Sequence, residues 1–268
     1  MYLSKRYDII KKSEVETMII QSFNLVHIIF LLCQPILIVL CYFLFRNRSY
    51  KFKRYMFMGV AIFNFIYFIV YKLWLYLDPA FHFNIWNELP LQLCNINIIL
   101  LFFAMLFDNK TLMSFVAVIG SVGAVMAMAF PDVNFVGVPF FSLRCIGFYG
   151  THMIIFVSSI SLMTLGMYKP TFKSIPLLLL VITIIATVIF SFNVIMRVTQ
   201  VYPECNYFYT YGMPGNAIFD LFWKLIPIPL LTLLPSLLIL LAYISLLIGI
   251  TKLIEIFKKK NNKSVNEA

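Results

Sequence analysis

Seven long apolar runs constrain the fold of this chain more than any other feature of its sequence. They cover residues 23–45, 55–77, 91–107, 112–130, 142–166, 175–194 and 226–251. Because an α-helix rises about 1.5 Å per residue, runs of this length cross, or nearly cross, about 30 Å of hydrocarbon. The composition agrees, with 62% hydrophobic and only 12% charged residues. The sequence therefore predicts an all-α fold: a polytopic membrane protein built as a bundle of seven transmembrane helices.

The stretches between these runs are too short to fold alone, so residues 1–268 are predicted to form a single domain. A polar N-terminal tail, residues 1–22, precedes the first run, and a basic C-terminal tail, residues 252–268, follows the last. The only long connection, residues 195–225, is rich in Tyr, Pro and Gly.

Basic residues predict how the chain is oriented in the cell membrane. Most of them follow the first, third and fifth runs or lie in the C-terminal tail: Arg46, Arg48, Lys51, Lys53, Arg54, Lys110, Lys169, Lys173, Lys252, Lys258, Lys259, Lys260 and Lys263. Positively charged connections mark the cytoplasmic side, so we expect the N-terminus outside and the C-terminus in the cytoplasm. The net charge of +10 then reflects topology and attraction to anionic lipids. Membrane lipids, and not nucleic acid, are the expected partners, and the oligomeric state stays open.

Polar residues crowd the start of the third run. Between residues 87 and 97 stand Asn87, Glu88, Gln92, Cys94, Asn95 and Asn97. Polar groups at membrane depth are costly unless they face the protein interior or a watery cavity, and such groups usually mark a functional site. This cluster is therefore the first place to look for one.

Further polar residues are predicted on the same, outer side of the bundle. They are Lys72 in the second run, Arg144 and His152 in the fifth, Arg197 at the end of the sixth, and Asn206 and Tyr207 in the long loop. Helix tilt allows the third and fifth runs to bring Cys94 and His152 together. A pocket in the outer half of the membrane is the simplest interpretation, with the basic side chains suited to a lipid phosphate.

The segment Glu88-Leu89-Pro90-Leu91-Gln92-Leu93-Cys94 resembles the start of the third span in the YwaF family of bacterial integral membrane proteins. The resemblance runs from about Glu88 to Leu247 and includes Gly120, Gly123 and Phe130-Pro131, the Phe140-Phe141 pair before His152, and Asn206-Tyr207-Phe208-Tyr209 with Pro214. The Trp223–Pro227 stretch matches only loosely. That family is similar to a eukaryotic seven-span phospholipid acyltransferase, in which a cysteine of the corresponding motif is proposed to carry the acyl group. The resemblance implies lipid-directed chemistry at Cys94.

The residues themselves allow this chemistry. A cysteine accepts an acyl group only as thiolate, which requires a base, and His152 is the candidate base, with Glu88 or a nearby amide to fix its tautomer. The catalytic set is thus Cys94, His152 and Glu88. Side chains that could bind substrate or polarise an oxyanion are Gln92, Asn95, Asn97, Lys72, Arg144, Arg197, Asn206 and Tyr207.

Simpler interpretations stay open. Cys94 also fits as a small apolar filler, His152 as an interhelical hydrogen bond, and Glu88 as a cap of the third helix. Whether the chain is an enzyme is not decided by the sequence, because a small-molecule binding protein or transporter, or a membrane scaffold or sensor, fits the same polar cluster. No cofactor is expected, and no metal, since paired His or Cys spacings are missing from the sequence. Cys145 and Cys205 share the outer side, and the sequence leaves their pairing open.

Overall fold

The structure is a computed structural model that describes residues 19–78, 83–131 and 135–266, and it is helical over most of that range. Six of the described helices are long and apolar enough to cross a membrane: Leu25–Phe45, Tyr50–Leu77, Lys110–Ala129, Leu143–Thr164, Phe172–Val198 and Leu231–Ile256. The helical, multi-pass class predicted from the sequence is confirmed. The predicted third span corresponds to a shorter apolar helix, Leu93–Leu106. Most of the predicted N-terminal tail lies outside the described residues.

The described elements follow in this order: β1 (Ile19–Ile20), α2 (Leu25–Phe45), α3 (Tyr50–Leu77), α4 (Ile85–Glu88), α5 (Leu93–Leu106), α6 (Lys110–Phe115), η1 (Val116–Gly120), α7 (Ser121–Ala129), β2 (Val138–Pro139), α8 (Leu143–Thr164), η3 (Phe172–Ser174), α9 (Ile175–Val198), η4 (Tyr207–Tyr209), α10 (Ala217–Leu225), η5 (Leu231–Leu233) and α11 (Leu234–Asn266). The two short strands pair antiparallel, with Ile20 opposite Val138. Polar side chains fix several helix starts; for example, Asn24, Ser49 and Ser142 each accept a hydrogen bond from a backbone amide of the first turn.

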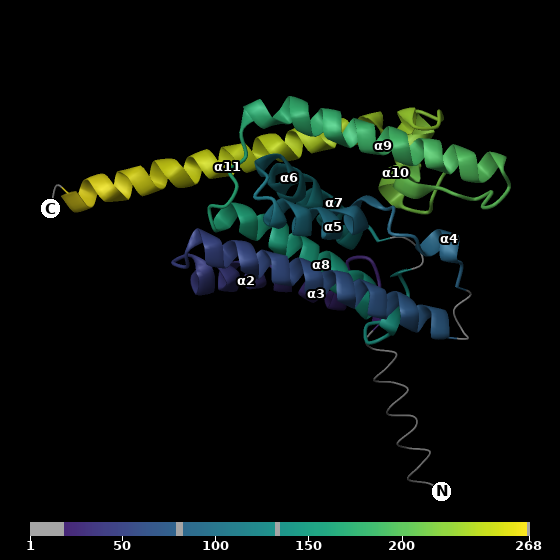
Figure 1. The fold of residues 1–268 in the computed structure, drawn as a ribbon, viewed down its shortest axis with the longest axis horizontal. Helices are drawn as coiled ribbons and strands as arrows, with labels where there is room; N and C mark the ends of the chain where they lie inside the picture. Colours follow the sequence, from purple (N-terminus) through teal and green to yellow (C-terminus); the bar gives the residue numbers. More distant parts are fainter. Residues whose placement is uncertain (1–18, 79–82, 132–134, 267–268) are drawn as a thin grey trace, which may run out of the picture.

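The helices form three groups across the bundle (Figure 1). α2 and α3 lie on one side, α9 and α11 lie on the other, and α5, α6, α7 and α8 lie between them. Burial follows this arrangement: 61% of the apolar window of Lys110–Ala129 and 56% of that of Leu143–Thr164 are buried, against 6% for Leu25–Phe45. The middle segments therefore form the interior, and the outer helices present apolar side chains to lipid.

Glycines allow the close approach of α3 and α8. A Cβ on Gly147 would lie 2.0 Å from the ring of Tyr71, and a Cβ on Gly150 would lie 2.6 Å from the hydroxyl of Tyr67. Side chains do not pack at such distances, so larger residues at either position would push the two helices apart. The tyrosines fill the space that the glycines leave.

The fourth predicted span is continuous but contains a π-helical turn. η1 connects α6 to α7, and its last residue, Gly120, faces two other helices. A Cβ on Gly120 would lie 2.6 Å from Ser159 Oγ and 3.3 Å from Asn97 Oδ1. The π turn admits one more residue than an α-helical turn, and the missing side chain lets α5 and α8 pack against it.

Some predicted helix boundaries are wrong. The second helix begins at Tyr50, five residues before the predicted residue 55. The third run was predicted to begin at residue 91, but residues 89–92 lie in turns and bends, and α5 begins at Leu93. The last span was expected to begin at residue 226, but it begins at Leu231. Pro227 and Pro229 lack the amide hydrogen that a helix requires, and Leu230 has a φ of 64°. The helix α10 in the long loop was not predicted from the sequence. At its C-terminal end, α11 continues through most of the predicted basic tail.

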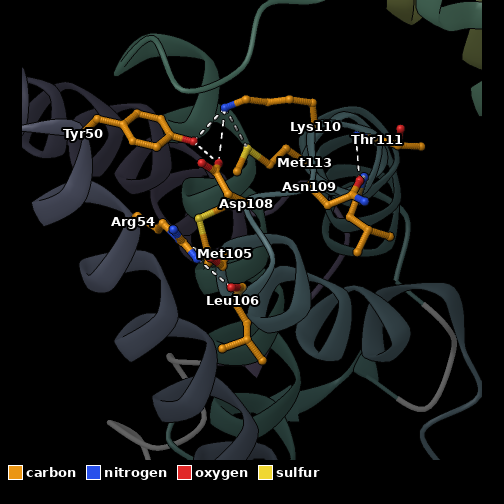
Figure 2. Close-up of polar contacts among 10 residues, drawn as sticks. Tyr50, Arg54, Met105, Leu106, Asp108, Asn109, Lys110, Thr111 and Met113 are labelled. Atoms are coloured by element: carbon orange, nitrogen blue, oxygen red, sulfur yellow. Dashed lines mark hydrogen bonds and ion pairs between the residues drawn. The ribbon is translucent and has the colours of Figure 1, made fainter.

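Basic side chains of α3 hold together the end of the bundle that carries the first basic loop. We call this region, formed by Arg46–Arg54, Met105–Lys110 and Leu165, the basic end. The Lys53 ammonium donates to the carbonyls of Arg46 and Leu165, both at 3.0 Å, and Lys53 is only 9% exposed. Arg54 donates to the carbonyls of Met105 and Leu106 at the end of α5 (Figure 2). Carbonyls at helix C-termini lack partners within the helix. Two neighbouring cations thus cap α2, α5 and α8.

A second contact closes the turn between α5 and α6. The Tyr50 hydroxyl donates to the Asp108 carboxylate and accepts from the Lys110 ammonium at 2.7 Å (Figure 2). Asn109 caps α6 through its side-chain oxygen, which accepts from the amides of Thr111 and Leu112. The Tyr50 hydrogen bond holds the pKa of the Asp108 carboxyl below its usual range. The basic end is therefore tied by hydrogen bonds between α3 and the α5–α6 turn.

Candidate functional site

A cavity of about 910 Å³ lies at the opposite end of the bundle, which we call the cavity end. It is as large as the biggest small-molecule pockets of proteins, which span about 300–1,000 Å³. Its walls come from α3, α5, α7, α8, α9 and α11, and from the loops that carry α4, η4 and α10. In Figure 1, α4 and α10 lie at this end and α11 extends beyond the other.

Cys94 lines the cavity from the first turn of α5. The helix follows Gln92, whose extended backbone ends the preceding turn and whose side chain makes no capping hydrogen bond. The first amides of a helix have no carbonyl partner within it, and the helix dipole favours negative charge there. Gly123 of α7 passes beside the thiol, since a Cβ there would lie 3.7 Å from Cys94 Sγ. The thiol therefore lies beside backbone amides that have no carbonyl partner within the helix.

His152 lines the same cavity from α8. Its Nδ1 lies 2.7 Å from the backbone carbonyl of Phe148, one turn earlier in the helix, and its ring packs on the Phe148 ring with centroids 4.3 Å apart. A carbonyl accepts only, so Nδ1 carries the proton and Nε2 keeps a free lone pair. The Phe148 carbonyl thus fixes the tautomer of His152. The sequence had led us to expect this role for Glu88 or a nearby amide.

Glu88 forms an ion pair with Lys72 across the cavity wall. The Lys72 ammonium also lies 4.9 Å from the centre of the Tyr71 ring and 5.4 Å from that of Phe68. The cap residue of α5 is Gln92, so the alternative that Glu88 caps this helix is wrong. Arg144 and Glu204 line the cavity too, which places two cations and two carboxylates on its walls.

The long loop covers the cavity and is tied to the residues before α5. The Phe208 amide donates to Gln92 Oε1 at 3.1 Å, and the Tyr207 hydroxyl donates to the carbonyl of Trp86. Asn206 exchanges two hydrogen bonds with Tyr211. Asn206 and Tyr207 line the cavity, so these contacts hold one wall in place.

Asn193 of α9 holds residues 205–210 of this loop in place. It was not among the residues predicted from the sequence. Its carboxamide, fully buried in α9, donates to Tyr207 O and Thr210 Oγ1 and accepts from the Tyr207 amide and the Cys205 thiol. An asparagine in an apolar run is the signal that could have identified it.

Strained backbone surrounds the cavity. Phe208, Tyr209 and Leu230 line it and have φ values of 60°, 54° and 64°. Such left-handed conformations cost about 1–3 kcal/mol each in residues other than glycine and occur often at functional sites. The surrounding hydrogen bonds hold the wall in a shape that the local sequence does not favour.

Two of the predicted substrate-binding residues lie outside the cavity lining. The Asn97 amide donates to the Leu93 carbonyl at 2.9 Å, and the side chain is buried between helices. Arg197 donates to the Cys205 carbonyl at 2.7 Å and lies over the Tyr211 ring. Both residues support the walls. The cavity does bring together Cys94, His152, Glu88, Gln92, Asn95, Lys72, Arg144, Asn206 and Tyr207.

The cysteines on either side of the site are separate. Cys145 and Cys205 are both free thiols, and each is buried in a different cluster of apolar side chains. Burial raises the pKa of the Cys205 thiol, which disfavours the reactive thiolate. The disulfide that the sequence left open is therefore not formed.

Residues 22–248 of the chain match the TMEM164 family, a family of membrane proteins. No curated protein matches the chain, and no solved structure matches it. The match covers every residue that lines the cavity. The YwaF resemblance and the related acyltransferase activity stay predictions.

Proposed function

The chain belongs to the TMEM164 family, and from its cavity we propose that it is a lipid-directed acyltransferase or hydrolase with Cys94 as nucleophile and His152 as base. The observation that supports the proposal is that Cys94 and His152 line the same cavity. A thiol lies in the first turn of a helix, and an imidazole with a free Nε2 lines the same space. These are the parts of a thiol–imidazole acyl-transfer site.

In the first half-reaction, His152 Nε2 takes the proton of the Cys94 thiol. The sulfur then attacks the ester carbonyl of a lipid, and the oxyanion forms next to the amides that begin α5. When the tetrahedral intermediate collapses, the C–O bond breaks and the leaving alkoxide takes the proton from His152. The products are a thioester on Cys94 and a lyso-lipid.

In the second half-reaction, His152 takes a proton from an acceptor hydroxyl, which belongs to a lyso-lipid in a transferase or to water in a hydrolase. The acceptor oxygen attacks the thioester carbonyl, the C–S bond breaks, and the leaving thiolate regains its proton from His152. The acyl group has then moved to the acceptor and the enzyme is unchanged.

The other cavity residues would bind the lipid. Lys72 and Arg144 supply positive charge for its phosphate. Glu88 would hold Lys72 in position, a role that its ion pair favours over a direct part in proton transfer. Asn95 would add a donor near the oxyanion, while Gln92, Asn206 and Tyr207 would keep the loop closed over the site.

We also propose that α5 makes the seventh crossing and that the cavity end faces the outside of the cell membrane. The placement of α5 between α3 and α7 supports the crossing, and the basic residues of the opposite end support the orientation. Maleimide labelling of single cysteines in intact cells tests it. Labelling of residue 48 from outside, with residue 204 protected, would reverse the orientation.

The function is tested with purified protein in lipid nanodiscs that contain a labelled phospholipid and a lyso-lipid. We expect Cys94→Ala to abolish both transfer and release of acyl groups, and Cys94→Ser to leave little activity. Wild type should accumulate a hydroxylamine-sensitive thioester when the acceptor is left out. Cys33→Ala is the matched control, because Cys33 is exposed on α2 and should keep full activity.

Acyl transfer by Cys94→Ala at the wild-type rate would overturn the nucleophile assignment. The cavity would then be a binding or transport site, the alternative that the sequence left open. Comparative lipidomics of cells with wild type and with Cys94→Ala would identify the lipids that turn over.

A further inference from the structure

The cavity has an apolar limb that extends away from the charged residues. Besides the charged wall described above, it is lined by residues of α9 and α11: Ile182, Thr183, Ala186, Thr187, Leu234, Ser236, Leu237, Ile239 and Leu240. Thr187 lies three helical turns from the end of α9 at Val198, which is about 16 Å along the helix. The limb thus reaches from the cavity end toward the middle of the bundle.

The limb opens to the surface of the bundle between α9 and α11. Several of its lining residues are themselves exposed: Thr183 and Thr187 on α9, and Leu234 and Ile239 on α11, the last two at 49% and 37%. These helices form one side of the molecule (Figure 1), and only 11% and 17% of their apolar windows are buried. In a membrane, that surface faces lipid.

Two of the hydroxyl groups near this opening are satisfied by their own helix. Thr187 Oγ1 donates to the carbonyl of Thr183 at 2.9 Å, and Ser191 Oγ donates to that of Thr187 at 2.9 Å. Hydroxyls satisfied by their own helix present mostly methyl and methylene surface to the outside. The remaining lining residues named above are aliphatic, apart from Thr183 and Ser236. The Ser236 hydroxyl donates to Leu233 O.

The cavity as a whole therefore has the polarity of a membrane lipid. Lys72, Glu88 and Arg144 lie at one part of it, and the aliphatic limb lies at another. A bilayer lipid has its charged headgroup at the interface and its chains in the hydrocarbon. The charged and aliphatic parts of the cavity follow one another in the same order.

We propose that the opening between α9 and α11 is a lateral portal through which one acyl chain of a bilayer phospholipid enters the cavity. This inference rests on the proposed function, since it names the path by which that site receives its lipid. The headgroup stays near Lys72 and Arg144 while the chain passes sideways between the helices and occupies the limb. The substrate thus never leaves the membrane.

The test uses a phospholipid that carries a photoreactive diazirine in the middle of one acyl chain, with protein in nanodiscs. Labelling is done in the Cys94→Ala background, so that binding is measured without turnover. We expect labelled peptides to contain residues 182–187 and 234–240. Labelling confined to the outer surfaces of α2 and α3 would overturn the portal, and this measurement depends on no further variant.

Two substitutions that fill the limb sharpen the test. Ala186→Trp and Leu237→Trp, one on each helix, should each lower labelling of the limb by about tenfold or more, because the chain loses much of its buried apolar area. Val188→Trp and Leu238→Trp are the controls. Those positions are 61% and 69% exposed, lie next to the limb in sequence and do not line it, so labelling should be unchanged.

The portal and the proposed function fail in different ways. Limb labelling at the wild-type level in both filling variants overturns the portal, while Cys94-dependent turnover would still stand. Turnover that persists in Cys94→Ala overturns the nucleophile, while labelling lost only in the filling variants would still support the portal.

Discussion

The basic end and the cavity end of the bundle treat buried charge in opposite ways. At the basic end, Lys53 and Arg54 donate to carbonyls at helix C-termini. At the cavity end, Lys72 and Glu88 pair with each other on the wall of a 910 Å³ space. His152 likewise uses one ring nitrogen on the backbone and keeps the other free.

This difference separates the residues whose substitution should lower stability from those whose substitution should lower activity. Polar groups that are fully used by the backbone fix helices to one another, and their loss should lower stability. Polar groups that border an empty volume are available to a ligand, and their loss should lower activity. Substitutions at the two ends should therefore produce different phenotypes.

The largest effect is expected for His152→Ala at the cavity end. Loss of a general base typically lowers the rate by a factor of about 100 or more, and we expect at least that loss of acyl transfer in nanodiscs. His27→Gln is a useful contrast, since His27 is fully buried and bonds to the Met128 carbonyl and the Phe23 amide. It should lower stability more than turnover. Equal loss of turnover in both variants would contradict the separation.

The next effect concerns the contact of α3 with α8. Gly147→Ala would place a methyl group against the Tyr71 ring, and overpacking of this kind costs about 1–3 kcal/mol. We expect a lower melting temperature in detergent. Gly59→Ala is the control, because nothing lies within 4 Å of a Cβ there; that variant should be as stable as wild type or more so.

Lys53→Met tests the basic end. It leaves the carbonyls of Arg46 and Leu165 without their donor, at a cost of about 1–3 kcal/mol. We expect a lower melting temperature and unchanged turnover per folded molecule. Lys51→Met, on the exposed face of the same helix, should leave both unchanged. Slower turnover at an unchanged melting temperature would show that Lys53 acts in the chemistry.

The smallest effect is a pH dependence of stability at the basic end. The Tyr50 hydrogen bond lowers the pKa of Asp108 in the folded protein, so its stabilising contribution is complete above the unfolded value of about 3.9. It is lost as the pH falls through the lower, folded value. Tyr50→Phe should weaken this acid dependence, as seen in melting temperatures between neutral and acidic pH. An identical dependence in wild type and Tyr50→Phe would contradict the assignment.

The sequence predicted most of the fold because membrane spans are encoded locally. Six of the predicted runs overlap long helices of the structure, and three of them agree with those helices within two residues at both ends. The errors fall where local patterns compete: residues 226–230 are apolar but contain two prolines, and residues 89–91 are apolar but contain Pro90 and lie in a turn. Hydropathy reports how side chains partition between water and hydrocarbon. It does not report whether the backbone at that position can form a helix.

The site was predicted in part, for a similar reason. Polar residues in apolar runs pointed to Cys94, His152 and Lys72, which line the cavity. Asn97 and Arg197 satisfied the same criterion but form contacts with backbone carbonyls. The contact of Lys53 with Leu165 joins residues 112 positions apart, and no local pattern encodes such a pairing.

The π-helical turn at Val116–Gly120 sets the angular phase of everything after it in α7. Removing one residue from that turn would restore a plain α-helix and rotate the rest of α7 by about 100° relative to α6. Gly123, Met126 and Ala127, which line the cavity, would then turn away from it. The extra residue of the π turn thus sets the rotation of α7 about its axis, and with it the face of α7 that contacts the thiol of Cys94.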